Sequence, residues 1–239
     1  MSEVSVPYVP WSKQRLVHMS DARFRVVVAG RQSGKSLTGV AEAAQWAMER
    51  KAVVWWVTAN YQVKDKAWRD LNAHLPPEVV RSSAESRNRF DLGNGSIVVI
   101  RSADGKDSLV AETLDGLVCD EFAQWREEAW LSLRPMLNVH NAPALFIGTP
   151  RGRNWAWKIW LRGQATYPMG HPEAGLPNPD HDPAYRSFHW RTAESPYSNP
   201  IEIEQARRDM PVGWFRQEYE ADIVDNAAAV FRGVQGCIR

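Results

Sequence analysis

The sequence predicts an α/β fold in which a largely parallel central sheet lies between layers of helices. Short, almost continuously apolar runs alternate with segments of helical character through much of the 239 residues. Such runs are typical of strands that are buried on both faces, as in a parallel sheet. One run leads into a glycine-containing loop and another ends in two acids, so chemistry is expected where strands end.

The strands and helices follow from local pattern. The expected strands are 24–29, 52–59, 96–101, 117–119 and 144–149, and the expected helices are 36–50, 63–73 and 127–137. Residues 90–92, the turn 93–95 and 96–101 together indicate a hairpin. A proline-rich stretch, 167–185, is expected to be an exposed, mobile loop. It is followed by a short strand, 186–190, and by two helices within 200–221 that are separated by a break at 211–213.

Composition excludes several classes of protein. The net charge is +1, which is too small for a protein that clings statically to nucleic acid through bulk charge. Two cysteines provide neither a disulfide framework nor metal-ligand spacing. No apolar run is long enough to span a bilayer, and residues 1–10 have no signal-peptide pattern. We therefore expect an intracellular protein without membrane partners, and we expect most of the twelve tryptophans to be core residues.

The segment from Ala29 to Ser36 has the pattern of a phosphate-binding loop. It follows an apolar run and precedes an Ala-rich stretch, which is the strand–loop–helix context that such a match requires. Gly34 lets the backbone approach phosphates, and loop N–H groups with the helix N-terminus supply partial positive charge. Lys35 would reach the β- and γ-phosphates, and Ser36 would take one Mg²⁺ position. The usual first glycine of the pattern is Ala29 here.

Two adjacent acids, Asp120 and Glu121, follow a short apolar strand downstream of Lys35. Asp120 is the expected Mg²⁺ carboxylate, and Glu121 would align the water that attacks the γ-phosphate or take its proton. The two acids can have separate tasks because the chain leaves the sheet between them. Taken alone, an Asp-Glu pair usually marks a solvated strand end, and it is the phosphate loop upstream that favours the catalytic interpretation.

Two further residues complete the expected site. The amide of Gln14 can pair with the adenine edge as donor and acceptor, although an ordinary polar helix residue is the plainer interpretation. The hydroxyl of Thr149, at the tip of the run 144–149, could sense the γ-phosphate. The predicted nucleotide-binding residues are Gln14, Gly30, Arg31, Gln32, Ser33, Gly34, Lys35 and Ser36.

Together these motifs resemble the large terminase subunit of tailed bacteriophages, the motor ATPase that pumps double-stranded DNA into procapsids. The resemblance runs in the family's order through nearly the whole chain. Its motifs are the adenine motif around Gln14, the loop Gly30 to Ser36, Thr58-Ala59-Asn60-Tyr61, the Asn94-Gly95-Ser96 hairpin, Asp120-Glu121, Gly148-Thr149-Pro150-Arg151-Gly152, Phe215-Arg216-Gln217-Glu218-Tyr219 and Val230-Phe231. The Asp-Glu pair is generic, whereas the combination of the other motifs is specific.

The resemblance implies a P-loop ATPase of the additional-strand type over 1–191, a small helical lid over 192–225, and over 226–239 the start of a linker. Relatives usually continue into an RNase H-like nuclease domain, so no nuclease activity is expected of this chain. ATP and Mg²⁺ are the implied cofactors, and the host cytoplasm is the implied location. The implied partners are double-stranded DNA, the capsid portal, the small terminase subunit and further copies of the chain in a ring, often a pentamer.

The resemblance also assigns roles to residues. The catalytic residues are Glu121, Lys35, Arg31 and Thr149, and the metal residues are Ser36 and Asp120. Two basic clusters are candidates for contact with DNA: Arg81, Arg87 and Arg89 form the first, and Arg151, Arg153, Lys158 and Arg162 form the second. A solvated surface explains either cluster equally well.

One departure concerns an arginine that many relatives carry shortly before the Asp-Glu pair, proposed as a finger on the neighbouring subunit's ATP. The matching segment here, 109–112, has none. Because a finger is worth roughly 10³ to 10⁵ in rate, slow hydrolysis or a substitute is expected. The nearby candidates are Arg101, Arg126 and Arg134.

Two alternatives stay open at the level of sequence. A superfamily 2 helicase-like DNA-dependent ATPase would share the adenine Gln, the loop and the acids, but the chain has no room for a second helicase domain. A degenerate nucleotide-binding interaction module without hydrolysis would be consistent with Ala29 and with the missing arginine.

Overall fold

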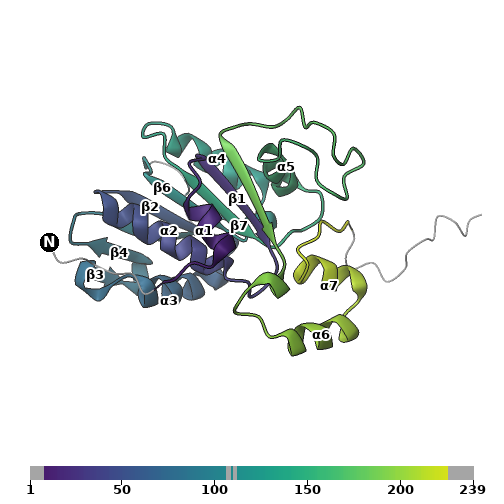
Figure 1. Cartoon of the computed structure of the whole chain (residues 1–239). Helices are drawn as coiled ribbons and strands as arrows, with labels where there is room; N and C mark the ends of the chain where they lie inside the picture. The colour runs from purple at the N-terminus through teal and green to yellow at the C-terminus, as the bar shows by residue number, and fades with distance from the viewer. Residues whose placement is uncertain (1–7, 106–108, 110–111, 226–239) are drawn as a thin grey trace, which may run out of the picture.

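A single eight-stranded sheet organises the molecule, as the computed structural model shows (Figure 1). The model describes residues 8–105, 109 and 112–225. The strand order is β3 (Val80–Ala84), β4 (Arg89–Leu92), β5 (Ile97–Ser102), β2 (Val53–Thr58), β6 (Gly116–Asp120), β7 (Ala144–Gly148), β1 (Phe24–Ala29) and β8 (Tyr185–Trp190). The six strands from β5 to β8 in this order are parallel, and β3 and β4 are antiparallel. The predicted largely parallel sheet is therefore confirmed, and β7 lies between β1 and β6.

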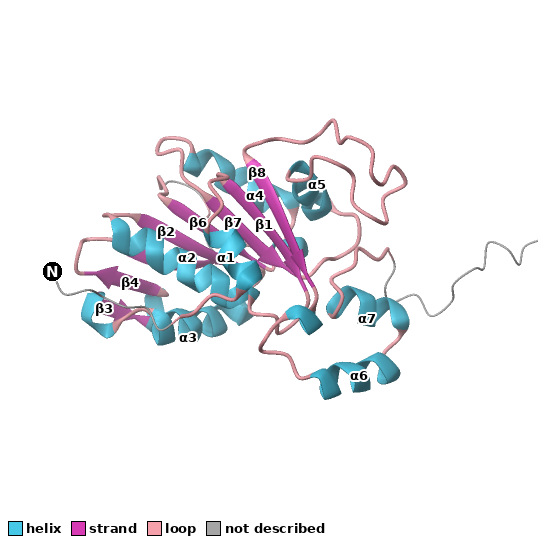
Figure 2. Cartoon of the chain, in the orientation of Figure 1, coloured by secondary structure: helices cyan, strands magenta, loops and turns pink. Residues whose placement is uncertain are grey.

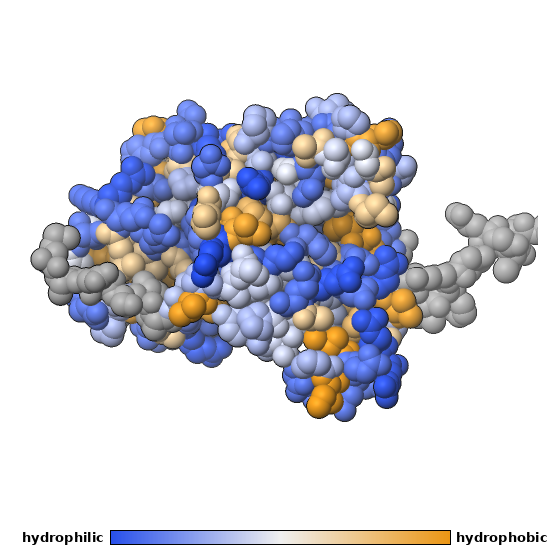
Figure 3. Space-filling model, in the orientation of Figure 1, coloured by the Kyte–Doolittle hydropathy of each residue, from blue (hydrophilic) through white to orange (hydrophobic). Residues whose placement is uncertain are grey.

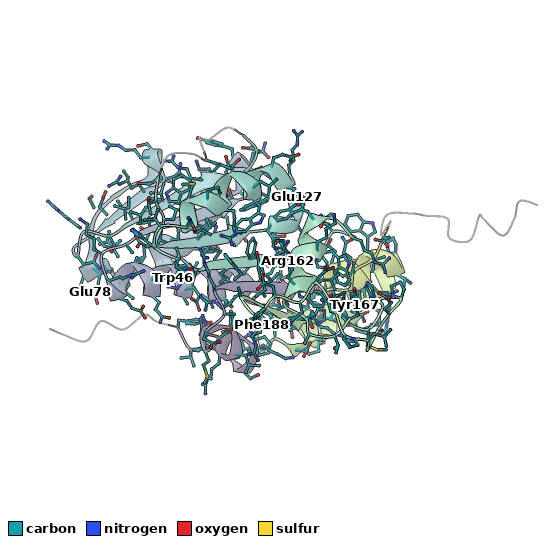
Figure 4. The ribbon with its side chains drawn as sticks, turned by 90° about the horizontal axis from the view of Figure 1, so that it is seen from above. Trp46, Glu78, Glu127, Arg162, Tyr167 and Phe188 are labelled. Carbon is teal, nitrogen blue, oxygen red and sulfur yellow. The ribbon has the colours of Figure 1, made fainter. Side chains whose placement is uncertain are left out.

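Helices cover both faces of this sheet (Figure 2). They are α1 (Ser12–His18), α2 (Lys35–Glu49), α3 (Lys64–His74), α4 (Glu127–Leu133), α5 (Trp155–Arg162), α6 (Pro200–Asp209) and α7 (Val212–Glu218). Seen from above, Glu127 of α4 and Trp46 of α2 lie on opposite sides of the sheet (Figure 4).

Alternation along β1 shows how one strand serves both layers. Phe24, Val26 and Val28 belong to the core beneath α4 and α5. Val27 and Ala29 belong to the core beneath α2 and α3. Because both faces of β1 are dry, the strand reads as a continuous apolar run, and its carboxyl end leaves the chain at the edge where the phosphate loop starts.

The structure adds elements that the pattern did not predict. β3 and α5 are both absent from the sequence prediction, and the predicted helix 127–137 is shorter than expected. It ends at Leu133 and continues as a 3₁₀ turn, Arg134–Leu137. Pro135 lies within this turn and has no N–H to donate to an α-helical hydrogen bond, which explains the early end.

The proline-rich loop, 167–185, is held at one point. It contains neither helix nor strand before Tyr185, and Met169 is 93% exposed, as predicted for a surface loop. Asn178 is buried, however, and its amide donates to the carbonyl oxygens of Leu161 (2.8 Å) and Gln164 (2.9 Å). These bonds fasten the loop to the end of α5.

Helices α6 and α7 form a small body beside the end of β1 (Figure 1). None of the α6 residues is buried. The surface of this region is apolar in part, with Ile201 and Val212 well exposed (Figure 3). The predicted helix–break–helix pattern is confirmed; the boundary of the predicted lid, 192–225, stays a prediction, and the linker over 226–239 lies outside the described residues. In the described part of the chain, no helix has the length and apolar character needed to cross a membrane.

Candidate functional site

The loop between β1 and α2 has the backbone of an anion-binding turn. Gln32 and Gly34 adopt left-handed conformations, with φ of 53° and 85°, on either side of Ser33. Such turns direct successive N–H groups inward, and the N-terminus of α2 begins at Lys35. Ala29 ends β1 in ordinary extended pairing with Trp190, so its Cβ needs no glycine. The departure from the usual motif therefore carries no cost in backbone strain.

Gly30 is the glycine on which close packing depends. A Cβ added there would lie 2.3 Å from Thr192 Oγ1 and 2.6 Å from the carbonyl oxygen of Tyr219. The neighbouring Arg31 N–H donates to the carbonyl oxygen of Glu218 at 2.7 Å, and Thr192 Oγ1 donates to the carbonyl oxygen of Arg31 at 2.9 Å. The loop is thus joined backbone to backbone with the region of the predicted lid.

A second set of bonds fixes the inside of the loop. The hydroxyl of Ser33, which is fully buried, donates to the carbonyl oxygen of Gly30 at 2.6 Å. The indole N–H of Trp190 donates to that hydroxyl at 2.9 Å. Trp190 is a functional residue that sequence reasoning missed, because its role depends on a contact across the sheet.

The predicted acids lie beside the loop, as required for a shared site. The Nζ atom of Lys35 is 3.7 Å from Oε1 of Glu121. Glu121 has a left-handed backbone, with φ of 52°, which turns it away from the line of β6 and of Asp120. Its Oε2 accepts from the backbone N–H of Thr149 at 3.3 Å and from the side chain of Gln124 at 3.2 Å. The structure brings Lys35, Glu121 and Thr149 together.

Asp120 is enclosed at the end of β6. Burial, together with the negative charge of Glu121, raises the pKa of Asp120 to about 7, against the opposing charges of Lys66 and Lys35. The Oδ1 atom has no well-formed hydrogen bond to a described residue, although the indole of Trp56 lies near enough to lower the pKa slightly. A buried carboxylate oxygen in this position calls for a cationic partner.

The residues present fit a hard divalent cation such as Mg²⁺. Besides Asp120 Oδ1, the hydroxyl of Thr149 is buried without a partner among the described residues. Over the same residues, no group of three His, Cys, Asp or Glu side chains forms a complete metal cage. Mg²⁺ needs none, because it typically takes one or two carboxylates and completes its shell with phosphate oxygens and water. Asp120 and Ser36 would hold it here.

A cavity of about 670 Å³ opens over the loop. Its walls come from the loop, from α3, from the segment after β6 and from the region of the predicted lid. The lining residues are Arg31, Gln32, Ser33, Gly34, Lys35, Ser36, Leu37, Val40, Val63, Lys66, Asp70, His74, Glu121, Gln124 and Tyr197. The convergence of Lys35 and Glu121 within this cavity identifies it as the candidate nucleotide site.

Gln14 lies behind the loop rather than on the cavity wall. It is fully buried; its amide donates to the carbonyl oxygen of Gly34 at 2.9 Å and accepts from the backbone N–H of Trp11 at 3.2 Å. Tyr197 packs on the same glycine, since a Cβ at Gly34 would lie 3.1 Å from its ring. Gln14 therefore braces the loop from α1, and its contact with adenine stays a prediction.

Arg31 is held by Glu218, the buried carboxylate of α7. The guanidinium of Arg31 forms an ion pair with one oxygen of Glu218, and Nη1 of Arg151 lies 2.7 Å from the other. Burial raises the pKa of Glu218, but hydrogen bonds from Gln217 and Arg31 and the positive charge of Arg151 outweigh it and lower the pKa overall. One carboxylate thus joins the phosphate loop to the segment that follows β7.

None of the three finger candidates lines the cavity. Arg101 lies over the ring of Trp55 at 5.1 Å. Arg126 is exposed at the N-terminus of α4. Arg134 lies over Phe24, at the end of β1 that is farthest from the loop. A role for any of them on a neighbouring subunit stays a prediction.

The two basic clusters differ in how far their charges are free. In the second cluster Arg151 is paired with Glu218 and Arg153 with Asp225, and Arg162 lies over the ring of Tyr185. In the first cluster, Arg81 and Arg87 are exposed on the β3–β4 hairpin and Arg89 is paired with Asp91. Contact with DNA stays a prediction for both.

Comparison with known proteins supplies independent findings. The family model described as terminase large subunit, T4likevirus-type, N-terminal, matches residues 26–235. The terminase large subunit of Escherichia phage T5 is 31% identical over 222 residues, which cover 90% of this chain and 46% of that protein. The terminase large subunit of Thermus virus P23-45 is 30% identical over 250 residues, with 95% and 51% covered. The chain spans about half the length of these relatives.

Solved structures show the same similarity. The large terminase ATPase domain of Thermus phage P74-26 superposes with a TM-score of 0.82 at 26% identity, covering 92% of this chain and 96% of that one. The large terminase of another thermophilic bacteriophage, solved in complex with ADP, has a TM-score of 0.68 at 16% identity, covering 90% and 54%. The second likeness shows a shared fold.

Proposed function

The chain belongs to the terminase large-subunit family, and from that premise we propose that it is the ATP-hydrolysing motor domain that drives double-stranded DNA into viral procapsids. The observation that carries the proposal is the approach of Lys35 to Glu121, 3.7 Å apart, over the phosphate loop. A cation and a carboxylate at the mouth of such a loop are what phosphoryl transfer to water requires.

Binding of the nucleotide falls to the loop. Its inward N–H groups and the N-terminus of α2 cradle the phosphates, and Lys35 neutralises the β- and γ-phosphates. Ser36 and Asp120 hold Mg²⁺, which when bound offsets the charge that develops on the phosphoryl oxygens. ATP binding is supported by the complexes of the thermophilic-phage terminase with ADP and with ATP-gamma-S, which share this fold.

Glu121 performs the chemistry. Its Oε2 is oriented by the backbone N–H of Thr149, and its left-handed backbone holds the carboxylate over the loop beside Lys35. The carboxylate orients a water for in-line attack on the γ-phosphorus and accepts a proton as the new P–O bond forms and the bond to ADP breaks.

Thr149 and Arg151 carry the consequence toward the lid. Thr149 touches the catalytic carboxylate through its N–H, and two residues later Arg151 is paired with Glu218 of α7. A shift of Glu121 when the γ-phosphate leaves therefore has a short mechanical route to the region of the lid. This chain of contacts supports the coupling role that the sequence motif implies for Thr149.

The working assembly is a ring of copies of this chain, most simply a pentamer, placed on the capsid portal with the small terminase subunit as a further partner. A subunit with a net charge of +1 suits such a ring, because several modest basic surfaces can share one duplex. The β3–β4 hairpin, with Arg81 and Arg87 exposed, is the stronger candidate for the contact with DNA.

Phosphate release from ATP, with and without double-stranded DNA, tests the proposal. Wild-type protein should release phosphate, and duplex should accelerate it. Lys35→Ala should lose nucleotide binding or turnover, whereas Glu121→Gln should bind ATP and fail to hydrolyse it. Normal turnover by Glu121→Gln would show that the carboxylate is not catalytic. Absence of hydrolysis by the wild type would favour the inert binding module, and strand displacement would favour the helicase-like alternative.

A further inference from the structure

α3 presents one face to the nucleotide cavity. Val63, Lys66, Asp70 and His74 line the cavity and follow one another at helical spacing. The opposite side of the helix, with Ala67, Trp68 and Leu71, is buried against α2 and the sheet. The packing of the buried side therefore fixes which α3 side chains meet the nucleotide.

We propose that Lys66 is a catalytic cation, which contacts the γ-phosphate of ATP bound in its own subunit and stabilises the charge of the transition state. The inference rests on the proposed function and adds a residue that no motif assigns. It also answers the missing arginine of segment 109–112, because a cation in cis can meet the same electrostatic need.

The two cations of the phosphate loop are already committed. Arg31 is paired with the buried Glu218, and Lys35 is buried beside Glu121 and donates to the carbonyl oxygen of Gly30 at 3.3 Å. The side chain of Lys66 is 58% exposed, and it lines the open space where the phosphates would lie. A lysine ammonium is a compact point charge on a flexible stem and can follow the phosphoryl group as it moves.

Asp70 holds Lys66 only loosely. Lys66 Nζ lies 2.5 Å from Oδ2 of Asp70, one helical turn later, and both side chains are partly exposed. In such pairs the acid is better placed before the base, so this order is the weaker one. A nucleoside triphosphate carries several negative charges, and its oxygens would therefore draw the ammonium away from a single solvated carboxylate.

Electrostatics places Lys66 within reach of the reaction centre. Its positive charge acts on Asp120 in the same direction as that of Lys35, lowering the pKa of this acid against the effect of burial. Lys66 therefore already acts, from the α3 wall of the cavity, on the residue expected to hold the metal.

Steady-state phosphate release by Lys66→Ala tests the inference, with Arg69→Ala as the matched control. Arg69 is an exposed cation on the same helix that does not line the cavity. Lys66→Ala should lower kcat by about 10² to 10³, as for removal of one transition-state donor, with KM within about threefold. Lys66→Arg should recover most of the rate, and Arg69→Ala should behave as wild type.

Two results separate failure of the inference from failure of the proposed function. If Lys66→Ala keeps kcat within about threefold of wild type while Lys35→Ala and Glu121→Gln are inactive, Lys66 has no catalytic role and the ATPase stands. If Lys35→Ala and Glu121→Gln both hydrolyse ATP normally, the site itself is misassigned.

Mixing inactive variants tests whether Lys66 acts in cis. Subunits with Lys66→Ala retain Glu121, and subunits with Glu121→Gln retain Lys66. If both residues serve the ATP of their own subunit, no site in the mixture is complete and hydrolysis stays at the level of the separate variants. Recovery of hydrolysis on mixing would show that Lys66 acts on a neighbour's ATP and would overturn the assignment in cis.

Discussion

The two walls of the nucleotide cavity are built in opposite ways. On the side of the lid, backbone and side-chain bonds from Thr192 and Glu218 hold the phosphate loop, and a Cβ at Gly30 would meet atoms at 2.3 Å. On the side of α3, Lys66 and Asp70 are partly exposed and are bound to each other by one ion pair. The first wall is prepared before ATP arrives, whereas the second can rearrange.

The contrast explains what each wall can contribute. A loop whose donors are fixed in place binds phosphates without reorganising, and this is where electrostatic catalysis gains most. A charge on an exposed helix face can exchange one partner for another at little cost, which suits a residue that must follow a departing phosphoryl group. Substitutions on the first wall should therefore change stability, and substitutions on the second should change rate.

Gly30→Ala should have the largest effect on stability. The added Cβ would collide with Thr192 Oγ1 and with the backbone of Tyr219, and neither backbone can move without separating the loop from the lid region. The free energy of unfolding should fall by about 3 kcal/mol, measured by urea denaturation. Gly93→Ala is the control, since its Cβ would meet only the carbonyl oxygen of Val79 at 3.8 Å. Equal effects of the two would contradict this account of the wall.

Glu218→Gln should come next, with a loss of about 2 kcal/mol, because the charged partner of two arginines is removed and one of these is more than half exposed. The pKa of Glu218 is lower in the folded protein than its ordinary value of 4.5. Its ionised form therefore stabilises the fold at neutral pH, and this contribution disappears as the pH falls below 4.5 through the folded pKa. The wild-type advantage should shrink over that range.

Glu220→Gln is the control for this experiment, because Glu220 is less buried and its contact with Arg207 is 3.4 Å long. Its effect should be within about 0.5 kcal/mol at every pH. A pH-independent difference between wild type and Glu218→Gln would show that the carboxylate does not act through its charge.

Asp120 gives a smaller effect, on metal affinity. Its pKa is raised to about 7 in the metal-free site, and Mg²⁺ requires the ionised form. Below pH 7 the metal must displace a proton, so Mg²⁺-dependent ATP affinity should fall by up to about tenfold per pH unit and level off above pH 7. Asp120→Asn provides the reference profile, which contains the titration of ATP itself. Parallel profiles would contradict the raised pKa.

Asp70→Asn should have the smallest effect on stability, below about 0.5 kcal/mol, because the exposed pair with Lys66 contributes little. Thermal unfolding measures it directly. A loss as large as that of Glu218→Gln would mean that the wall at α3 is as firmly built as the other, and the comparison would fail.

The sequence predicted the strands that carry chemistry because those strands are buried on both faces. β1, β2 and β7 are apolar throughout most of their length, and their pattern needs no knowledge of neighbours. β3 has three exposed residues in its centre and becomes a strand only by pairing with β4. α5 was missed although Asn154 marks its start, where the side-chain oxygen accepts from the N–H of Ala156 at 3.0 Å.

The candidate site was predictable where its residues are local and not where they meet across the fold. Lys35 and Asp120 stand in recognisable patterns at strand ends. Thr192 and Glu218 reach the phosphate loop from more than 150 residues away, and no spacing indicates those contacts. Gly34 was expected to be the point of closest approach, and the structure adds Gly30, whose neighbours belong to this distant segment.

A structure of Glu121→Gln bound to ATP and Mg²⁺ tests the central claim most directly. The account predicts a γ-phosphate between the side chains at 35 and 121, with the metal held from the side of Ser36 and Asp120. A triphosphate bound elsewhere in the molecule, or a metal with neither residue within coordination distance, would contradict it.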